Sequence, residues 1–227
     1  MINYTTTGKA SSSRHVNVLM TGEAGVGKTT QIQNLQNHFN TLIISAEGGL
    51  LPLRHLDICV IEVTSYDAFE EAYQFIANSD EAKTFDAVAI DSISEVTQVC
   101  LENEKLLNKD PRKAYGEMAD KMIQKLRQFR DVQKHLYVTA KQAKEKDEAT
   151  GRFIFTPSTE GRKVAAELPY TFDEVFVLRM MPAEDGTLNR LIQTTGCDQY
   201  IAKDRSGILD NFEAPDIGSI IKKITGE

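Results

Sequence analysis

Short apolar runs alternate with amphipathic stretches over most of the chain. Five of these runs have the length and composition of buried strands, namely residues 15–22, 41–45, 57–63, 85–91 and 135–140. Between them, apolar residues recur at the three- and four-residue spacing of a helix, in residues 29–39, 66–77, 92–107 and a segment that begins at Pro111. Strands that alternate with helices in this way predict a mainly parallel sheet flanked by helices.

The pattern changes in the last third of the chain. Residues 141–162 are polar and predict a long loop, and loops of that length are usually functional or mobile. Residues 173–180 and 188–195 flank an Asp185-Gly186 pair, which is typical of a hairpin turn, and residues 214–224 predict a closing helix. The expected fold class is therefore α/β, with a mainly parallel sheet, flanking helices and an antiparallel C-terminal hairpin.

The bulk composition is that of an ordinary globular protein. A length of 227 residues suits one domain, and we expect a flexible arm over residues 1–14 and a single domain over residues 15–227. Hydrophobic residues make up 41% and charged residues 26%, and no apolar stretch approaches the roughly 20 residues of a membrane span. The three cysteines follow no CxxC spacing, which indicates a reducing compartment and predicts a cytoplasmic protein.

Charge is unevenly distributed along the chain, although the formal net charge is only −7. Acidic residues dominate residues 62–104, and basic residues dominate residues 105–146. Two interpretations are open: two solvated helices of opposite charge, or a basic surface that faces DNA or another subunit.

One motif in the sequence predicts phosphate binding. Residues 22–29, GEAGVGKT, match the phosphate-binding pattern G-x-x-x-x-G-K-[ST] between a predicted strand and a predicted helix. The glycines let the backbone curl until successive N–H groups point at phosphate oxygens. Lys28 would contact the β and γ phosphates of ATP, and Thr29 would offer its hydroxyl to Mg²⁺. The expected nucleotide-binding residues are Gly22, Glu23, Ala24, Gly25, Val26, Gly27, Lys28, Thr29 and Thr30.

Two acids stand where predicted strands end. Asp91 follows an apolar strand and is expected to hold Mg²⁺ together with Thr29, although it could instead cap the helix that begins at Ser92. Glu47 ends the strand that follows the phosphate-loop helix, where a carboxylate can orient and deprotonate the attacking water. Glu95 is the competing candidate for that role.

Four segments in order, GEAGVGKTT, ISAEGG, VAIDS and AKDRSG, resemble RecA-like core ATPases. The resemblance is greatest to small phage-encoded nucleotide-binding or Sak-type single-strand annealing proteins. It implies a Mg-ATP hydrolase of the host cytoplasm that acts as a homo-oligomer in DNA recombination. Single-stranded DNA and a single-strand-binding protein would be its partners, and Glu47 would be its catalytic glutamate.

The same resemblance gives a role to the cationic turn AKDRSG, which could otherwise be a solvated surface turn. In RecA-like proteins, similar turns reach the ATP of a neighbouring subunit. Lys203 and Arg205 would then be catalytic fingers that act in trans on transition-state charge.

Several points stay open. Lys141 and Gln142 both follow the strand at residues 135–140 and compete for the role of γ-phosphate sensor. Phe153 and Phe155 could stack on bases of DNA, or could pair within a short hairpin. The alternative functions are a phosphoryl-transfer kinase, with Arg152 and Arg162 on a lid, and a scaffold that binds ATP without depending on its hydrolysis.

Overall fold

The computed structural model describes residue 6 and residues 15–148 and 150–227. Apart from Thr6, the arm predicted over residues 1–14 lies outside the described residues. The described chain builds an eight-stranded sheet with the order β10-β9-β8-β1-β5-β4-β2-β3. The strands are β1 (Asn17–Thr21), β2 (Thr41–Ser45), β3 (Cys59–Glu62), β4 (Ala87–Asp91), β5 (His135–Thr139), β8 (Glu174–Pro182), β9 (Leu188–Gln193) and β10 (Phe212–Glu213).

Strands β1 to β5 and β8 run parallel, and β9 and β10 continue the sheet in antiparallel pairs. This arrangement confirms the predicted fold class, that of a P-loop NTPase. After β1 the chain crosses to β2 on one side of the sheet, whereas β8 pairs with β1 on the other side. A strand from which the connections diverge is where ligands bind in open α/β sheets, so the end of β1 is the expected site.

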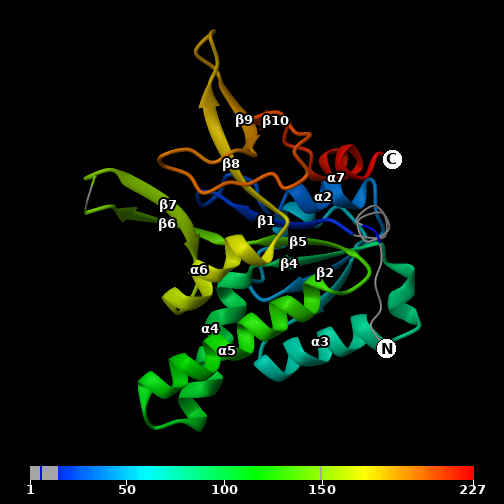
Figure 1. Cartoon of the computed structure of the whole chain (residues 1–227). Coiled ribbons are helices and arrows are strands. Elements are labelled where there is room, and N and C mark those ends of the chain that lie inside the picture. The colour runs from blue at the N-terminus through cyan, green and yellow to red at the C-terminus, as the bar shows by residue number, and fades with distance from the viewer. Residues whose placement is uncertain (1–5, 7–14, 149) are drawn as a thin grey trace.

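Helices cover both faces of the sheet (Figure 1). One face carries α2 (Gln31–Gln36) and α7 (Ile217–Thr225); the other carries α3 (Tyr66–Asn78), α4 (Ile93–Leu107), α5 (Pro111–Arg130) and α6 (Arg162–Thr171). Because side chains alternate along a strand, Val18 and Met20 of β1 enter the core around α2, while Leu19 enters the core under α4 and α5. Two layers of apolar residues therefore hold the strand that leads into the phosphate loop.

The prediction of one long loop over residues 141–162 is wrong, whereas the open alternative of a short hairpin around Phe153 and Phe155 is confirmed. Strands β6 (Lys141–Lys146) and β7 (Phe153–Ser158) form an antiparallel hairpin, and α6 begins at Arg162. The hairpin projects away from the main sheet in Figure 1. Its strand β6, KQAKEK, is mostly exposed and carries no large apolar residue, so the strand pattern was absent from the sequence.

The acidic and basic stretches face each other across neighbouring helices. Lys121 of α5 pairs with Glu104 of α4 at 2.5 Å, and Lys125 of α5 pairs with Glu70 of α3 at 2.5 Å. The carboxylate of Glu104 and the ammonium of Lys125 are both buried in these pairs. Part of the basic stretch therefore holds the helical layer together and does not form a free surface. Among the described helices, none is long and apolar enough to cross a membrane.

Candidate nucleotide-binding site

The phosphate loop, residues 22–29, curls at the carboxyl end of β1 and leads into α2. The Lys28 ammonium lies inside the curl and donates hydrogen bonds to the carbonyl oxygens of Gly22 at 2.8 Å and Glu23 at 2.9 Å. Gly27 has a φ of +103°, a conformation that only glycine adopts easily. A Cβ added to Gly22 would lie 2.6 Å from the Leu178 carbonyl oxygen, so the loop packs directly on β8.

Burial and nearby carboxylates act on the Lys28 ammonium in opposite directions. Burial lowers the pKa of Lys28, and the carboxylates of Asp91 and Glu47 oppose this change because they stabilise the charged amine. Tyr137 of β5 donates a hydrogen bond from its hydroxyl to the Lys28 carbonyl oxygen at 2.9 Å. The backbone at Lys28 is thus tied to the centre of the sheet while its side chain lies in the loop.

Asp91 ends β4 and is 2% exposed. Its Oδ2 accepts a hydrogen bond from the Thr29 hydroxyl at 2.7 Å, and its Oδ1 accepts one from the Thr139 hydroxyl. The sequence reasoning missed Thr139, whose only signal is a polar residue at the end of an apolar strand. Capping of α4 by Asp91 is not observed, since the N-cap is Ser92 and it makes no side-chain capping bond.

The residues around Asp91 fit a magnesium ion. Asp91 and Thr29 offer a carboxylate and a hydroxyl, and hard oxygen ligands of this kind are those that Mg²⁺ prefers. The hydroxyls of Ser92 and of Ser45, which lies opposite Asp91 in the register of β2 and β4, are buried and have no hydrogen-bond partner. Unsatisfied buried hydroxyls beside a carboxylate provide further oxygens for the ion or its water ligands.

Glu47 follows the end of β2 and is exposed. Its carboxylate opposes the lowering of the Lys28 pKa by burial and adds to the raising of the Lys141 pKa that the Glu95 pair causes, so it lies near both lysines. Lys141 forms an ion pair with Glu95, the main cause of its raised pKa, and its backbone N–H donates to the Ser94 hydroxyl at 2.9 Å. Glu95 is therefore already paired, whereas no ion pair within 4.0 Å involves Glu47 in the described part of the chain.

Lys141 and Gln142 both lie near the phosphate loop. Lys141 is close to Glu47, while Gln142 lines a small cavity of about 80 Å³ together with Glu23, Arg179 and Tyr200. The Gln142 Nε2 is buried and has no partner. Either residue can respond to a bound phosphate, so the identity of the sensor stays a prediction.

Comparison with known proteins assigns the family. A family model described as an AAA domain matches residues 14–206. The chain belongs to the AAA domain family. The X-ray structure of the Legionella pneumophila ATPase DotB is similar to this AAA domain at 10% identity, with a TM-score of 0.36, over 81% of this chain and 46% of DotB. No curated protein matches the chain.

The AAA domain keeps the cationic turn away from its own phosphate loop. The Lys203 ammonium donates to the carbonyl oxygens of Pro169 and Phe172, both at 2.6 Å, and the Arg205 guanidinium pairs with Asp173 at 2.8 Å. Phe172 and Asp173 immediately precede β8, next to the start of β1. The turn thus lies at the opposite end of the sheet from the site, and its action on a neighbouring subunit stays a prediction.

The β6–β7 hairpin uses one of its two phenylalanines internally. Phe155 stacks on Tyr200 with ring centroids 4.7 Å apart and an interplanar angle of 7°, and Arg152 pairs with Asp198. Phe153 is 44% exposed beside the Lys144 ammonium, which lies 4.0 Å from the ring centroid. Of the two candidates for base stacking, Phe153 is exposed, whereas Phe155 is half-buried and already stacked.

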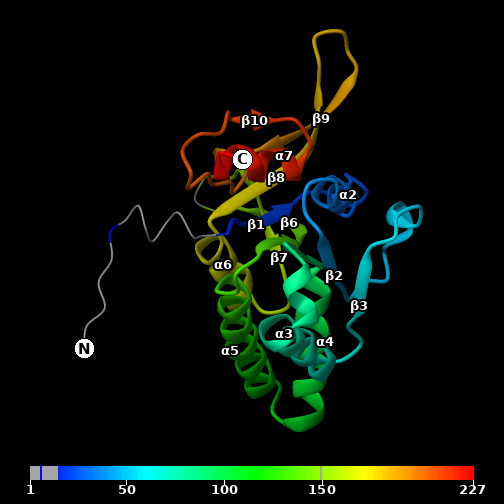
Figure 2. The same ribbon diagram turned by 90° about the vertical axis from the view of Figure 1, so that its right-hand side faces the viewer.

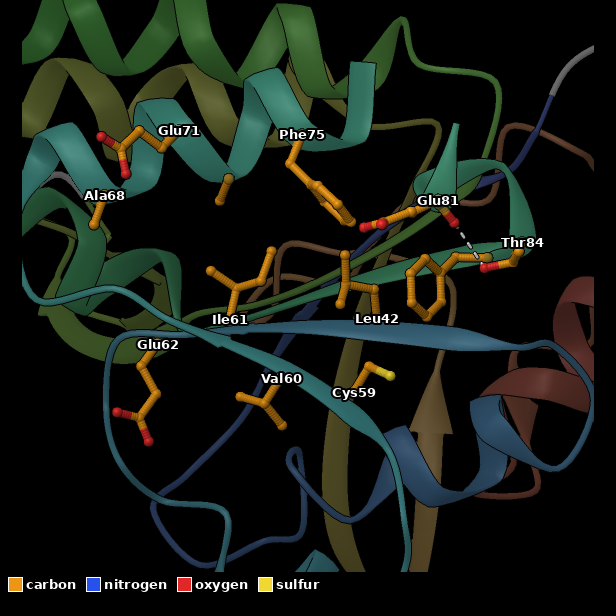
Figure 3. Close-up of a pocket in the computed structure, with 12 residues that line it drawn as sticks. Leu42, Cys59, Val60, Ile61, Glu62, Ala68, Glu71, Phe75, Glu81 and Thr84 are labelled. Atoms are coloured by element: carbon orange, nitrogen blue, oxygen red, sulfur yellow. Dashed lines mark hydrogen bonds between the residues drawn. The ribbon is translucent and has the colours of Figure 1, made fainter. Parts of the chain in front are cut away.

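A second hollow, of about 680 Å³, lies between α3 and the edge strand β3 (Figure 3). Figure 2 shows β3 at the margin of the sheet. Apolar side chains such as Leu42, Ile61 and Phe75 line the hollow, together with three glutamates. It contains no residue of the phosphate loop, so it is separate from the nucleotide site.

Proposed function

We propose that this AAA domain binds Mg-ATP and hydrolyses it by in-line attack of water. The observation that carries the proposal is the hydrogen bond from Thr29 to Asp91, at 2.7 Å, which joins the phosphate loop to the carboxyl end of β4. Such a junction places a phosphate-binding turn, a hydroxyl and a carboxylate at one point. These are the groups that the phosphates of a nucleotide and its Mg²⁺ require.

Each side chain then has a distinct task. The Lys28 ammonium would exchange the carbonyl oxygens of Gly22 and Glu23 for the β and γ phosphates, a charge-assisted contact that is stronger than the one it leaves. Asp91 and Thr29 would hold Mg²⁺, which supplies charge neutralisation on the phosphates when bound. Glu47 would orient and deprotonate the attacking water, because its carboxylate lies near Lys28 and forms no ion pair with any other described residue.

The test of the proposal is the Glu47→Gln variant. We expect it to bind ATP as the native protein does and to release phosphate at least about 100-fold more slowly, since the amide cannot take a proton. Glu95→Gln is the matched control, and its phosphate release should change far less. Unchanged hydrolysis in Glu47→Gln would remove Glu47 from the mechanism, and failure of the native protein to bind ATP would overturn the proposal as a whole.

We further propose that the domain acts as a homo-oligomer on single-stranded DNA in recombination or annealing. The resemblance of the four sequence segments to RecA-like ATPases supports this, and so does the exposed pair of Phe153 and Lys144 on the hairpin. Arg205 is the better finger candidate, because its side chain is 50% exposed whereas Lys203 is held by two carbonyls.

Two measurements address these finer points. Single-stranded DNA should raise ATP turnover, and a mixture of the Arg205→Ala and Glu47→Gln proteins should recover activity that neither has alone, since some subunit pairs would contain one intact site. No stimulation by DNA would exclude the DNA-dependent ATPase. No recovery at any mixing ratio would exclude Arg205 as a finger in trans.

A further inference from the structure

The β8–β9 hairpin carries two arginines near the phosphate loop, and their surroundings differ. Arg179 has partners within the chain: its Nη1 donates to Gln193 at 2.6 Å, and its Cζ lies 3.9 Å from the centroid of the Tyr200 ring. Arg190 is exposed and, among the described residues, forms no ion pair and no side-chain hydrogen bond. An arginine without a partner beside a phosphate-binding turn requires an explanation.

The position of Arg190 is fixed by the sheet. It lies opposite Met180 in the pairing of β8 with β9, two residues before the buried Ile192. Alternation along β9 puts Arg190 and Ile192 on one face, and Ile192 packs in the core around α2. The register therefore carries the Arg190 side chain over the loop that precedes α2.

The guanidinium of Arg190 lies directly against Gly27. A Cβ added to Gly27 would lie 3.3 Å from its Cζ, 3.4 Å from its Nε and 3.5 Å from its Nη1. Gly27 is next to Lys28, whose ammonium is already in the loop. Two cations thus gather at one turn of the backbone, and the carboxylates of Asp91 and Glu47 stabilise the charge of Lys28.

We propose that Arg190 binds the phosphates of the nucleotide held in the phosphate loop of its own chain. A guanidinium presents a planar fork of donors that matches phosphate oxygens, and it keeps its charge at every physiological pH. This inference rests on the proposed nucleotide binding. It adds a cation that acts in cis, in contrast to the trans role expected for Arg205.

The experiment compares two ligands with three variants. The affinities of the native protein, Arg190→Ala, Arg190→Lys and Arg112→Ala for ATP and for inorganic tripolyphosphate are measured by calorimetry with Mg²⁺ present. In Arg190→Ala, loss of the contact should lower the affinity for both ligands about tenfold or more. The affinities of Arg190→Lys should lie between those of the native protein and Arg190→Ala, because lysine keeps the charge but lacks the planar set of donors. Arg112 is exposed at the start of α5 and forms no ion pair within the described part of the chain, so its substitution is the matched control and should leave both affinities unchanged.

Three outcomes would decide against the inference or its basis. Unchanged affinities in Arg190→Ala would overturn it. Weaker binding of ATP with unchanged binding of tripolyphosphate would place the contact on the base or ribose, and would overturn the assignment to the phosphates. If the native protein binds neither ligand, the proposed nucleotide binding itself fails. Thermal unfolding of Arg190→Ala should match that of the native protein, which separates a lost contact from a lost fold.

Discussion

Lys28 and Lys203 make the same kind of contact at opposite ends of the sheet. Each ammonium donates to two backbone carbonyl oxygens of its own chain, Gly22 and Glu23 for Lys28, and Pro169 and Phe172 for Lys203. Burial is the main cause of a lowered pKa in both. A list of contacts would give the two lysines the same role.

What differs is the origin of the carbonyls. Those around Lys28 belong to a turn that offers N–H groups to an anion, so the lysine can exchange them for phosphate. Those around Lys203 belong to the last turn and the C-cap of α6, where carbonyls lack partners within the helix and a cation stabilises the end. Lys203 therefore closes the end of a helix of its own chain, whereas the contacts of Lys28 are ones that a bound phosphate could replace.

The sharpest way to separate the two lysines is to remove Lys28. We expect Lys28→Ala to weaken ATP binding by about 100-fold or more, because two charge-assisted contacts to phosphate are lost. The variant should stay folded and lose about 1 to 2 kcal/mol of unfolding free energy at most, since the carbonyls of Gly22 and Glu23 lose a charged donor. Calorimetric titration and a thermal melt measure both quantities, and tight ATP binding by this variant would contradict the role given to Lys28.

The Lys203 end of the sheet should respond to pH. Burial and the neighbouring Asp204 raise the pKa of Glu174 from its ordinary value of 4.5 to about 8. Between these values the folded protein retains a proton that the unfolded chain releases, so stability falls as the pH rises and levels off above about 8. Glu174→Gln is neutral throughout and should lose this dependence, a relative gain on the order of 4 kcal/mol at pH 8. Urea unfolding of both proteins from pH 5 to pH 8 measures this difference. The same change of unfolding free energy with pH in both proteins would refute the role given to Glu174.

Of the substitutions at Lys28, Glu174 and Lys203, the last should have the smallest effect. The carbonyls of Pro169 and Phe172 would lose their charged donor, which lowers the free energy of unfolding by about 1 to 2 kcal/mol. ATP affinity should not change, and Lys203→Arg should restore part of the stability. Urea unfolding and ATP titration of both variants test this. A weaker ATP affinity at unchanged stability would show that the comparison with Lys28 is wrong.

The sequence by itself determined the features that depend on local spacing. Alternating apolar runs predicted the parallel strands and their flanking helices, and the glycine pattern of residues 22–29 predicted the turn that holds Lys28. Because parallel strands end at one edge of a sheet, the acid that closes β4 could be placed beside that turn. Asp91 and Thr29 do lie together there.

Only the tertiary structure decided which residues meet across strands distant in the sequence. Thr139 reaches Asp91 through the pairing of β4 with β5, and Arg190 reaches Gly27 through the register of β9 on β8. The strand β6 likewise gave no apolar pattern, because its side chains are mostly exposed. Periodicity reports which face of an element is buried, but contacts between elements depend on register and crossing, which a single sequence does not encode locally.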